Sequence, residues 1–285
     1  MKPNDTFLNL PKNFWAGVRL ISQEVGYTEK STRQIKIPAI SEIRSKIGKF
    51  DLDFERLKVQ RTSKGYFWQL LQDYFAYRAD VINTFIEPRL MSVAEARKTF
   101  RKLYKDLQPS CPIPTNKQKG KMKQPAYLTG LVNMLIEANA DGLACDYDPH
   151  QLTIVTKDRL PVRTLARRVD GAFPSSVNPI AIWEIKEYYY TTTFGSRVAD
   201  GIYESLLDGL EIEELREHEG VDIEHYLIVD AYDTWWKLGK SYLCRIIDML
   251  HMGYIDEVLF GREVIERLPA LVKEWVGIYH SQSRQ

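Results

Sequence analysis

The spacing of hydrophobic residues predicts helices throughout the first half of the chain. Apolar residues recur every three or four positions at Phe14, Val18, Ile21 and Val25. This spacing is typical of one buried helical stripe. Similar patterns predict helices over residues 41–47 and 67–86, the second of which ends before Pro88. A fourth helix is expected to begin at Ser92, because Ser92-Val93-Ala94-Glu95 has the S-x-x-E form of a capping box.

The second half of the chain alternates between helical and strand-like patterns. A helix over residues 126–140 has its apolar residues on one stripe, and short apolar runs beyond it predict strands. The expected strands cover residues 152–155, 162–169, 180–186, 225–231 and 255–260, and the later helices cover residues 195–210, 240–252 and 263–279. This order predicts an α/β fold, in which helices flank a mixed β-sheet.

A basic segment separates the two halves. Residues 109–125 contain four prolines and the lysines Lys117, Lys119, Lys121 and Lys123, with almost no large apolar residue. This composition is typical of a linker or an exposed loop. We therefore expect a mostly helical basic region (1–108), a basic linker (109–125) and a catalytic core (126–285).

Charge is distributed unevenly, although the net charge is only +1. Residues 1–125 hold 24 Lys or Arg against 12 Asp or Glu, which leaves 15 against 26 for residues 126–285. A basic half attracts polyanions, whereas an acidic half can gather carboxylates around a divalent cation. The residues expected to contact DNA phosphates are Arg97, Lys98, Arg101 and Lys102 on the fourth helix, together with the linker lysines. The alternative is a patchy surface and a solvated linker without a ligand.

Several classes of protein are disfavoured by what the sequence contains. The cysteines Cys111, Cys145 and Cys244 are odd in number and widely separated, which argues against a disulfide framework or a CxxC zinc site. The apolar runs are too short for a membrane span, and residues 1–10 do not resemble a secretory signal. We therefore expect a cytoplasmic protein that does not associate with membranes.

The most specific feature is a pair of segments that carry two carboxylates and a lysine. Val169-Asp170-Gly171 is followed, after a proline-containing turn, by Ile182-Trp183-Glu184-Ile185-Lys186. Residues two apart in a strand point to the same face, so Glu184 and Lys186 project together while Trp183 enters the core. If the preceding strand pairs through the turn, Asp170 lies beside Glu184.

This grouping suits the hydrolysis of a phosphodiester. Carboxylate oxygens of Asp170 and Glu184 can hold Mg²⁺, which activates water and neutralises charge on phosphorus. Lys186 can orient the water and stabilise the transition state. Because the neighbouring carboxylates raise the pKa of Lys186, we favour this electrostatic role over proton abstraction. The alternative is a surface Glu-Lys pair on an edge strand.

At these residues the sequence resembles the PD-(D/E)XK nuclease superfamily, the fold of most type II restriction endonucleases. The resemblance covers residues 126–231 and includes the order helix, three strands, helix, strand, with the motif on the second and third strands. One departure is that Arg168 and Val169, rather than proline, precede Asp170. In this superfamily the first core helix often supplies a further carboxylate, which would be Glu137 as a third metal ligand.

The resemblance implies a restriction-endonuclease-like fold and a sequence-specific, Mg²⁺-dependent endonuclease that cleaves double-stranded DNA as a homodimer at a palindromic site. Tyr190 and Arg197, which follow the motif, are further candidates for DNA contacts. Two alternatives stay open: a structure-specific repair or recombination nuclease, and a DNA-binding protein whose nuclease-like core is inactive. The sequence contains no Walker loop, so nothing indicates an ATP-driven motor.

Overall fold

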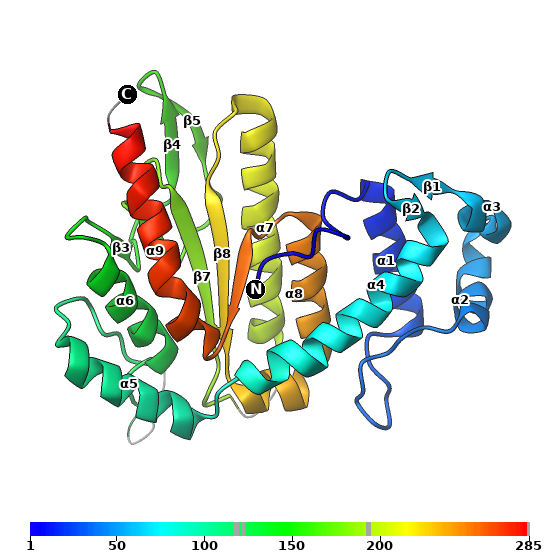
Figure 1. The fold of residues 1–285 in the computed structure, drawn as a ribbon, viewed down its shortest axis with the longest axis horizontal. Helices are drawn as coiled ribbons and strands as arrows, with labels where there is room; N and C mark the ends of the chain where they lie inside the picture. Colours follow the sequence, from blue (N-terminus) through cyan, green and yellow to red (C-terminus); the bar gives the residue numbers. More distant parts are fainter. Residues whose placement is uncertain (117–119, 121–122, 192–194, 284–285) are drawn as a thin grey trace.

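A mixed β-sheet with helices on both faces forms the C-terminal part of the protein, and a helical lobe formed by the N-terminal part lies beside it (Figure 1). The computed structural model describes residues 1–116, 120, 123–191 and 195–283. The α-helices are α1 (Lys12–Val25), α2 (Ile40–Ile47), α3 (Phe54–Val59), α4 (Phe67–Val81), α5 (Val93–Leu107), α6 (Tyr127–Asn139), α7 (Ser196–Glu219), α8 (Lys240–Met252) and α9 (Glu263–Gln282). Within the described residues, none of these helices is long and apolar enough to cross a membrane.

The sheet that carries the motif has five strands in the order β3-β6-β7-β8-β9. The strands of the protein are β1 (Arg61–Thr62), β2 (Gly65–Tyr66), β3 (Asp146–Tyr147), β4 (Ile154–Lys157), β5 (Leu160–Thr164), β6 (Gly171–Phe173), β7 (Ala181–Glu187), β8 (Glu224–Asp230) and β9 (Glu257–Phe260). β3, β6 and β7 are antiparallel neighbours, whereas β7, β8 and β9 run parallel. The expected mixed α/β architecture is therefore confirmed.

Side-chain alternation along β7 determines which helices cover each face of the sheet. Trp183 points toward α6 and α9, where its ring stacks on Trp275 with ring centroids 5.7 Å apart. Ile182 packs on the other face, in a cluster with Ile212 and Leu215 of α7. Figure 1 shows the resulting layers, with α6 and α9 on one side of the sheet and α7 and α8 on the other.

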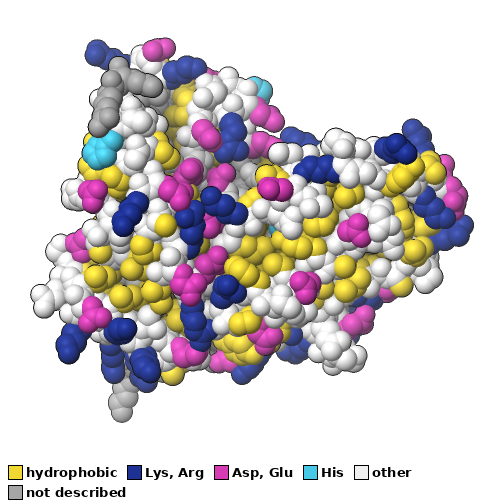
Figure 2. Space-filling view, viewed as in Figure 1, with side chains coloured by type: hydrophobic (Ala, Val, Ile, Leu, Met, Phe, Trp, Pro, Cys, Tyr) yellow, Lys and Arg dark blue, Asp and Glu magenta, His cyan; other side chains and the backbone are white. Residues whose placement is uncertain are grey.

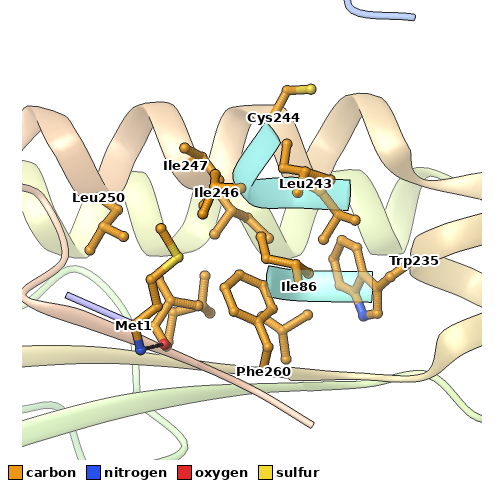
Figure 3. Packing of buried hydrophobic residues seen from close by; sticks show 14 of the residues in the cluster. Met1, Ile86, Trp235, Leu243, Cys244, Ile246, Ile247, Leu250 and Phe260 are labelled. Atoms are coloured by element: carbon orange, nitrogen blue, oxygen red, sulfur yellow. Dashed lines mark hydrogen bonds between the residues drawn. The ribbon is translucent and has the colours of Figure 1, made fainter. Parts of the chain in front are cut away.

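The N-terminal lobe is attached to the sheet domain through buried contacts. Arg78 on α4 forms an ion pair with Asp248 on α8 at 3.0 Å, and the Tyr74 hydroxyl donates to the same carboxylate at 2.6 Å. A hydrophobic cluster continues this junction (Figure 3). Its members include Met1, Ile86, Trp235, Leu243, Ile246, Ile247, Leu250 and Phe260. Buried side chains from the N-terminal lobe and from the sheet domain therefore pack together at the junction.

The division of the chain lies earlier than the sequence predicts. α5, which the sequence pattern assigns to the N-terminal region, packs along α6, and Phe100 lies directly over Gly130. A Cβ at Gly130 would come within 2.5 Å of the Phe100 ring, so only glycine permits this approach. α5 is therefore part of the sheet domain.

One predicted strand is wrong. The expected strand over residues 162–169 ends at Thr164, and β5 pairs with β4 in a separate hairpin. Leu165 and Val169 then turn inward to the core between the sheet and α7. Their apolar character reflects burial in an irregular segment, which has the same local pattern as a strand. The strand that pairs with β7 is the short β6, directly after Asp170.

Candidate active site

Asp170 is held at the start of β6 by the backbone of β7. Its N–H donates to the Trp183 carbonyl at 3.2 Å, and its carboxylate accepts the Ile185 N–H at 2.8 Å. Gly171 follows because the indole of Trp183 crosses this point, and a Cβ at Gly171 would lie only 2.2 Å from it. The Asp-Gly pair therefore combines a candidate functional carboxylate with a residue that the packing requires.

Glu184 and Lys186 project from β7 toward α7, as the alternation predicts. Both side chains are buried, and Lys186 Nζ donates to Glu184 Oε2 at 2.8 Å and to Glu204 Oε2 on α7 at 3.0 Å. α7 comes close to the strand here because Gly201 lacks a side chain. A Cβ at Gly201 would lie 3.1 Å from the Lys186 stem and 2.9 Å from the Tyr188 hydroxyl.

Two further charged residues, Arg167 and Asp208, belong to this site and were missed from the sequence. Arg167 lies in the irregular segment after β5, and its guanidinium forms a two-pronged pair with Glu184 at 2.7 and 3.1 Å. It also donates to Asp208 of α7 at 2.6 Å. Asp208 lies four residues after Glu204, so the two acids share one face of α7. That spacing is the signal that could have identified Asp208.

The pKa values in the site are perturbed by burial and by mutual charge. Burial and the neighbouring Glu184 raise the pKa of Asp170 to about 6, while burial raises the pKa of Asp208 to about 7 despite the opposing effect of Arg167. Burial also favours the neutral form of Glu184, but Lys186 and Arg167 outweigh it and lower the pKa of that carboxyl. Glu184 is therefore the carboxylate most firmly held in its charged form.

Lys186 is held in its protonated form. Burial alone would lower the pKa of Lys186, but Glu184 and Asp170 outweigh this effect and raise it above the ordinary value. A lysine in this state is a poor proton acceptor. It can donate hydrogen bonds and stabilise negative charge.

Comparison with known families divides the chain in two. Residues 91–275 match the family described as "Domain of unknown function (DUF7687)", and residues 1–85 match "Domain of unknown function (DUF7690)". The first match covers more than half of the chain. The protein belongs to the DUF7687 family. No curated protein and no solved structure matches the chain.

The DUF7687 region contains the whole candidate site, together with α5. The boundary between the two family matches lies between residues 85 and 91, close to the bend where the N-terminal lobe ends and before α5 begins. This division agrees with the packing of α5 against α6 and differs from the expected boundary at residue 108.

The predicted third ligand, Glu137, does not lie at the DUF7687 site. Its carboxylate accepts the backbone N–H of Ser110 at 3.0 Å and also contacts the Ser110 hydroxyl. α6, which carries Glu137, packs on the Trp183 face of the sheet, whereas Glu184 points to the opposite face. The expectation that Glu137 joins Asp170 and Glu184 is therefore wrong, because the sheet separates them.

The predicted DNA-binding residues, all within the DUF7687 region, differ in whether their side chains are exposed, half-buried or outside the described residues. The side chains of Arg97, Lys98, Arg101 and Lys102 are all exposed on α5, and Figure 2 shows Lys and Arg side chains gathered over this helix at the lower left. Lys123 is also exposed, whereas Tyr190 is half-buried beside the cluster formed by α5 and α6. Lys117, Lys119, Lys121 and the side chain of Arg197 lie outside the described residues.

The donor chemistry of the DUF7687 site fits a divalent cation. Carboxylate oxygens are the hard ligands that Mg²⁺ prefers, and Asp208 Oδ1 is a buried oxygen without a hydrogen-bond partner. The described residues contain no group of three His, Cys, Asp or Glu side chains already arranged to hold a metal ion. Arg167 lies between Glu184 and Asp208, so these two carboxylates bind a guanidinium.

Proposed function

We propose that this protein is a Mg²⁺-dependent endonuclease that hydrolyses phosphodiester bonds in double-stranded DNA, in the manner of a type II restriction enzyme. The observation that carries the proposal is the convergence of Asp170, Glu184 and Lys186 on one face of the β6–β7 pair. The element order from α6 to β8 supports it, because it includes the helix, antiparallel strands, helix and parallel strand expected of a restriction-endonuclease-like core.

The charges of the site suit catalysis at a phosphate. When bound, a divalent cation would lower the pKa of a water molecule and neutralise charge on the phosphate. Asp170 and Glu184 would hold it through their carboxylate oxygens. Lys186, kept protonated by its neighbours, would donate to a phosphate oxygen or to the attacking water, where an ammonium stabilises developing negative charge.

The basic face of α5 supports DNA as the substrate. α5 lies along the edge where β7 and β8 end, and Lys186 is near the carboxyl end of β7 (Figure 1). Four exposed cations on one helix can neutralise several phosphates and position a duplex without reading its sequence. Sequence specificity and a homodimeric assembly stay predictions within this proposal.

Incubation of the purified protein with plasmid DNA and Mg²⁺ tests the proposal. Discrete fragments are expected from the wild type, and none from Asp170→Asn or Glu184→Gln. The matched control is Glu214→Gln, which changes a half-exposed carboxylate of α7 that pairs with Arg163 outside the site. This variant should cleave DNA as the wild type does. Full activity of either site variant would overturn the assignment, whereas a smear in place of fragments would indicate a nuclease that recognises DNA structure.

A second candidate function is a DNA-binding protein with an inactive nuclease-like core. The pair between Arg167 and Glu184 favours this alternative, because an arginine occupies the carboxylate on which metal binding depends. Salt-sensitive binding of DNA without cleavage under Mg²⁺, Mn²⁺ or Ca²⁺ would select it over the nuclease.

A further inference from the structure

Asp208 is a buried carboxylate in which one of the two oxygens has no hydrogen-bond partner. Its side chain is 0% exposed, and only Oδ2 has a partner, the Arg167 guanidinium at 2.6 Å. Oδ1 is buried without a hydrogen bond. A buried polar oxygen without a partner is costly, so this arrangement leaves Oδ1 available to a hydrogen-bond donor or to a cation.

The charge of the site points to the same conclusion. Among its described side chains are two cations, Arg167 and Lys186, and four carboxylates, namely Asp170, Glu184, Glu204 and Asp208. The adjacent His225 is buried, and burial lowers its pKa, which favours the neutral imidazole. When all four carboxyls are ionised, the formal excess is two negative charges, which one divalent cation would balance.

Arg167 lies where it can be replaced. Its guanidinium contacts Glu184, Asp208 and, at 3.6 Å, Glu204, so it connects β7 with α7. Unlike those of Glu184 and Asp208, its side chain is 21% exposed, and it belongs to an irregular segment that forms no ladder with the main sheet. The guanidinium can therefore swing outward without breaking the strands that hold the carboxylates.

We propose that Asp208 is a further carboxylate ligand of the divalent cation, and that Arg167 is the resident cation that holds Glu184 and Asp208 together until the metal displaces it. This inference rests on the proposed function, because it concerns the same metal. It explains why the described carboxylates do not form a ready-made cage: a guanidinium between them keeps them at hydrogen-bonding distance from its nitrogens. Once displaced, Arg167 would be a positioning residue, free to form a two-pronged contact with a phosphate.

Metal titration without DNA tests the inference independently of cleavage. Isothermal titration with Mg²⁺ and Mn²⁺, supported by Tb³⁺ luminescence, would compare the wild type with Arg167→Gln and Asp208→Asn at pH 8. Arg167→Gln removes a competing cation and should bind metal about tenfold more tightly, which corresponds to about 1.4 kcal/mol. Asp208→Asn removes a ligand and should bind at least about tenfold more weakly.

Two further variants serve as controls. Arg167→Lys keeps the positive charge and should retain an affinity close to that of the wild type. Arg163→Gln removes an arginine of similar exposure, which pairs outside the site with Glu214 of α7, the helix that also carries Asp208. This variant should leave metal affinity unchanged. Thermal unfolding without metal shows whether each variant is folded. Unfolding with metal should then give a larger rise in Tm for Arg167→Gln than for the wild type.

The outcomes distinguish this inference from the proposed function. If the wild type binds metal and cleaves DNA, but Arg167→Gln and Asp208→Asn bind metal as it does, the inference fails and the nuclease stands. If the wild type neither binds metal nor cleaves while Arg167→Gln binds metal, the resident-cation role is supported and the wild type is not a nuclease. If no variant binds metal, both are overturned.

Discussion

Replacing Asp170 with asparagine should stabilise the metal-free protein at pH 8. The pKa of Asp170 is raised from 3.8 to about 6, chiefly by burial and then by Glu184. A pKa that differs by one between the folded and unfolded states corresponds to about 1.4 kcal/mol, so keeping the carboxylate charged in the folded state costs up to about 3 kcal/mol. Asp170 keeps some contact with solvent, so we expect about half of that figure. Asparagine avoids this cost and can still accept the Ile185 N–H through its carbonyl oxygen.

The sign of the pH dependence follows from the direction in which the pKa of Asp170 moves. Because the folded-state pKa lies above the unfolded value, the folded protein binds the proton more tightly, and stability is lost as the pH rises between about 4 and 6. Asp170→Asn lacks this group, so its advantage should be greatest above pH 6 and should diminish toward pH 4. Asp170→Asn should also be unable to cleave DNA, so the variant would be more stable and inactive.

Thermal or urea unfolding in EDTA at several pH values measures the effect. A gain of about 1–2 kcal/mol corresponds to a rise in Tm of a few degrees for a chain of this size. Asp222→Asn, at an exposed surface carboxylate, is the control and should stay within about 0.5 kcal/mol of the wild type. A variant that is less stable than the wild type at pH 8, or equally stable at every pH, would refute the argument that the charge of Asp170 destabilises the fold.

Three other predictions concern the chemistry, the DNA contact and the packing of the site. Lys186→Met should lower cleavage by at least about a hundredfold in a plasmid assay while Mg²⁺ still binds in calorimetry, because the lysine is not a ligand; loss of both would mean that its role is misassigned. Alanine at Arg97, Lys98, Arg101 and Lys102 together should reduce the slope of log K against log salt by about 0.9 for each phosphate that the helix no longer neutralises. An unchanged slope in filter binding would exclude α5 as the DNA-binding surface. Gly171→Ala should destabilise the fold by about 1–3 kcal/mol or prevent folding, because its methyl group would overlap Trp183, whereas Gly277→Ala on α9, with open space around it, should be neutral or slightly stabilising in denaturant unfolding.

Local pattern was sufficient to predict most helices and the relation among Asp170, Glu184 and Lys186. Alternation along one strand determines that Glu184 and Lys186 share a face, and a short turn back from β6 brings Asp170 beside them. These features depend on residues close in sequence. The structure brings the three residues together for that reason, although their catalytic roles stay predictions.

Contacts between distant elements were not predictable in the same way. Arg167 belongs to a segment whose apolar residues Leu165 and Val169 imitate a strand, so its guanidinium was not expected to turn toward Glu184. Glu137 was misplaced because helical periodicity gives the buried stripe of α6 but not the face of the sheet on which α6 packs. The way the chain connects α6 to the strands decides that face, and the periodicity of α6 alone does not encode it.

The same alternation gives β7 a second role on its other face. Glu187, one residue beyond Lys186, accepts the backbone N–H and the hydroxyl of Thr129 in the first turn of α6, at 3.0 and 3.1 Å. Asp230, which is its register partner on β8, accepts the Met91 N–H just before α5 at 2.7 Å. Backbone N–H groups at a helix start have no partner within the helix, so these two carboxyls, by accepting N–H groups there, hold α5 and α6 at the edge where β7 and β8 end. Even-numbered residues of β7 therefore form the proposed catalytic site, while the next odd-numbered one anchors a helix beside the basic α5. Two neighbouring strands, β7 and β8, therefore carry both the proposed metal site and the anchors of α6 and of α5, whose exposed cations are the proposed DNA contacts.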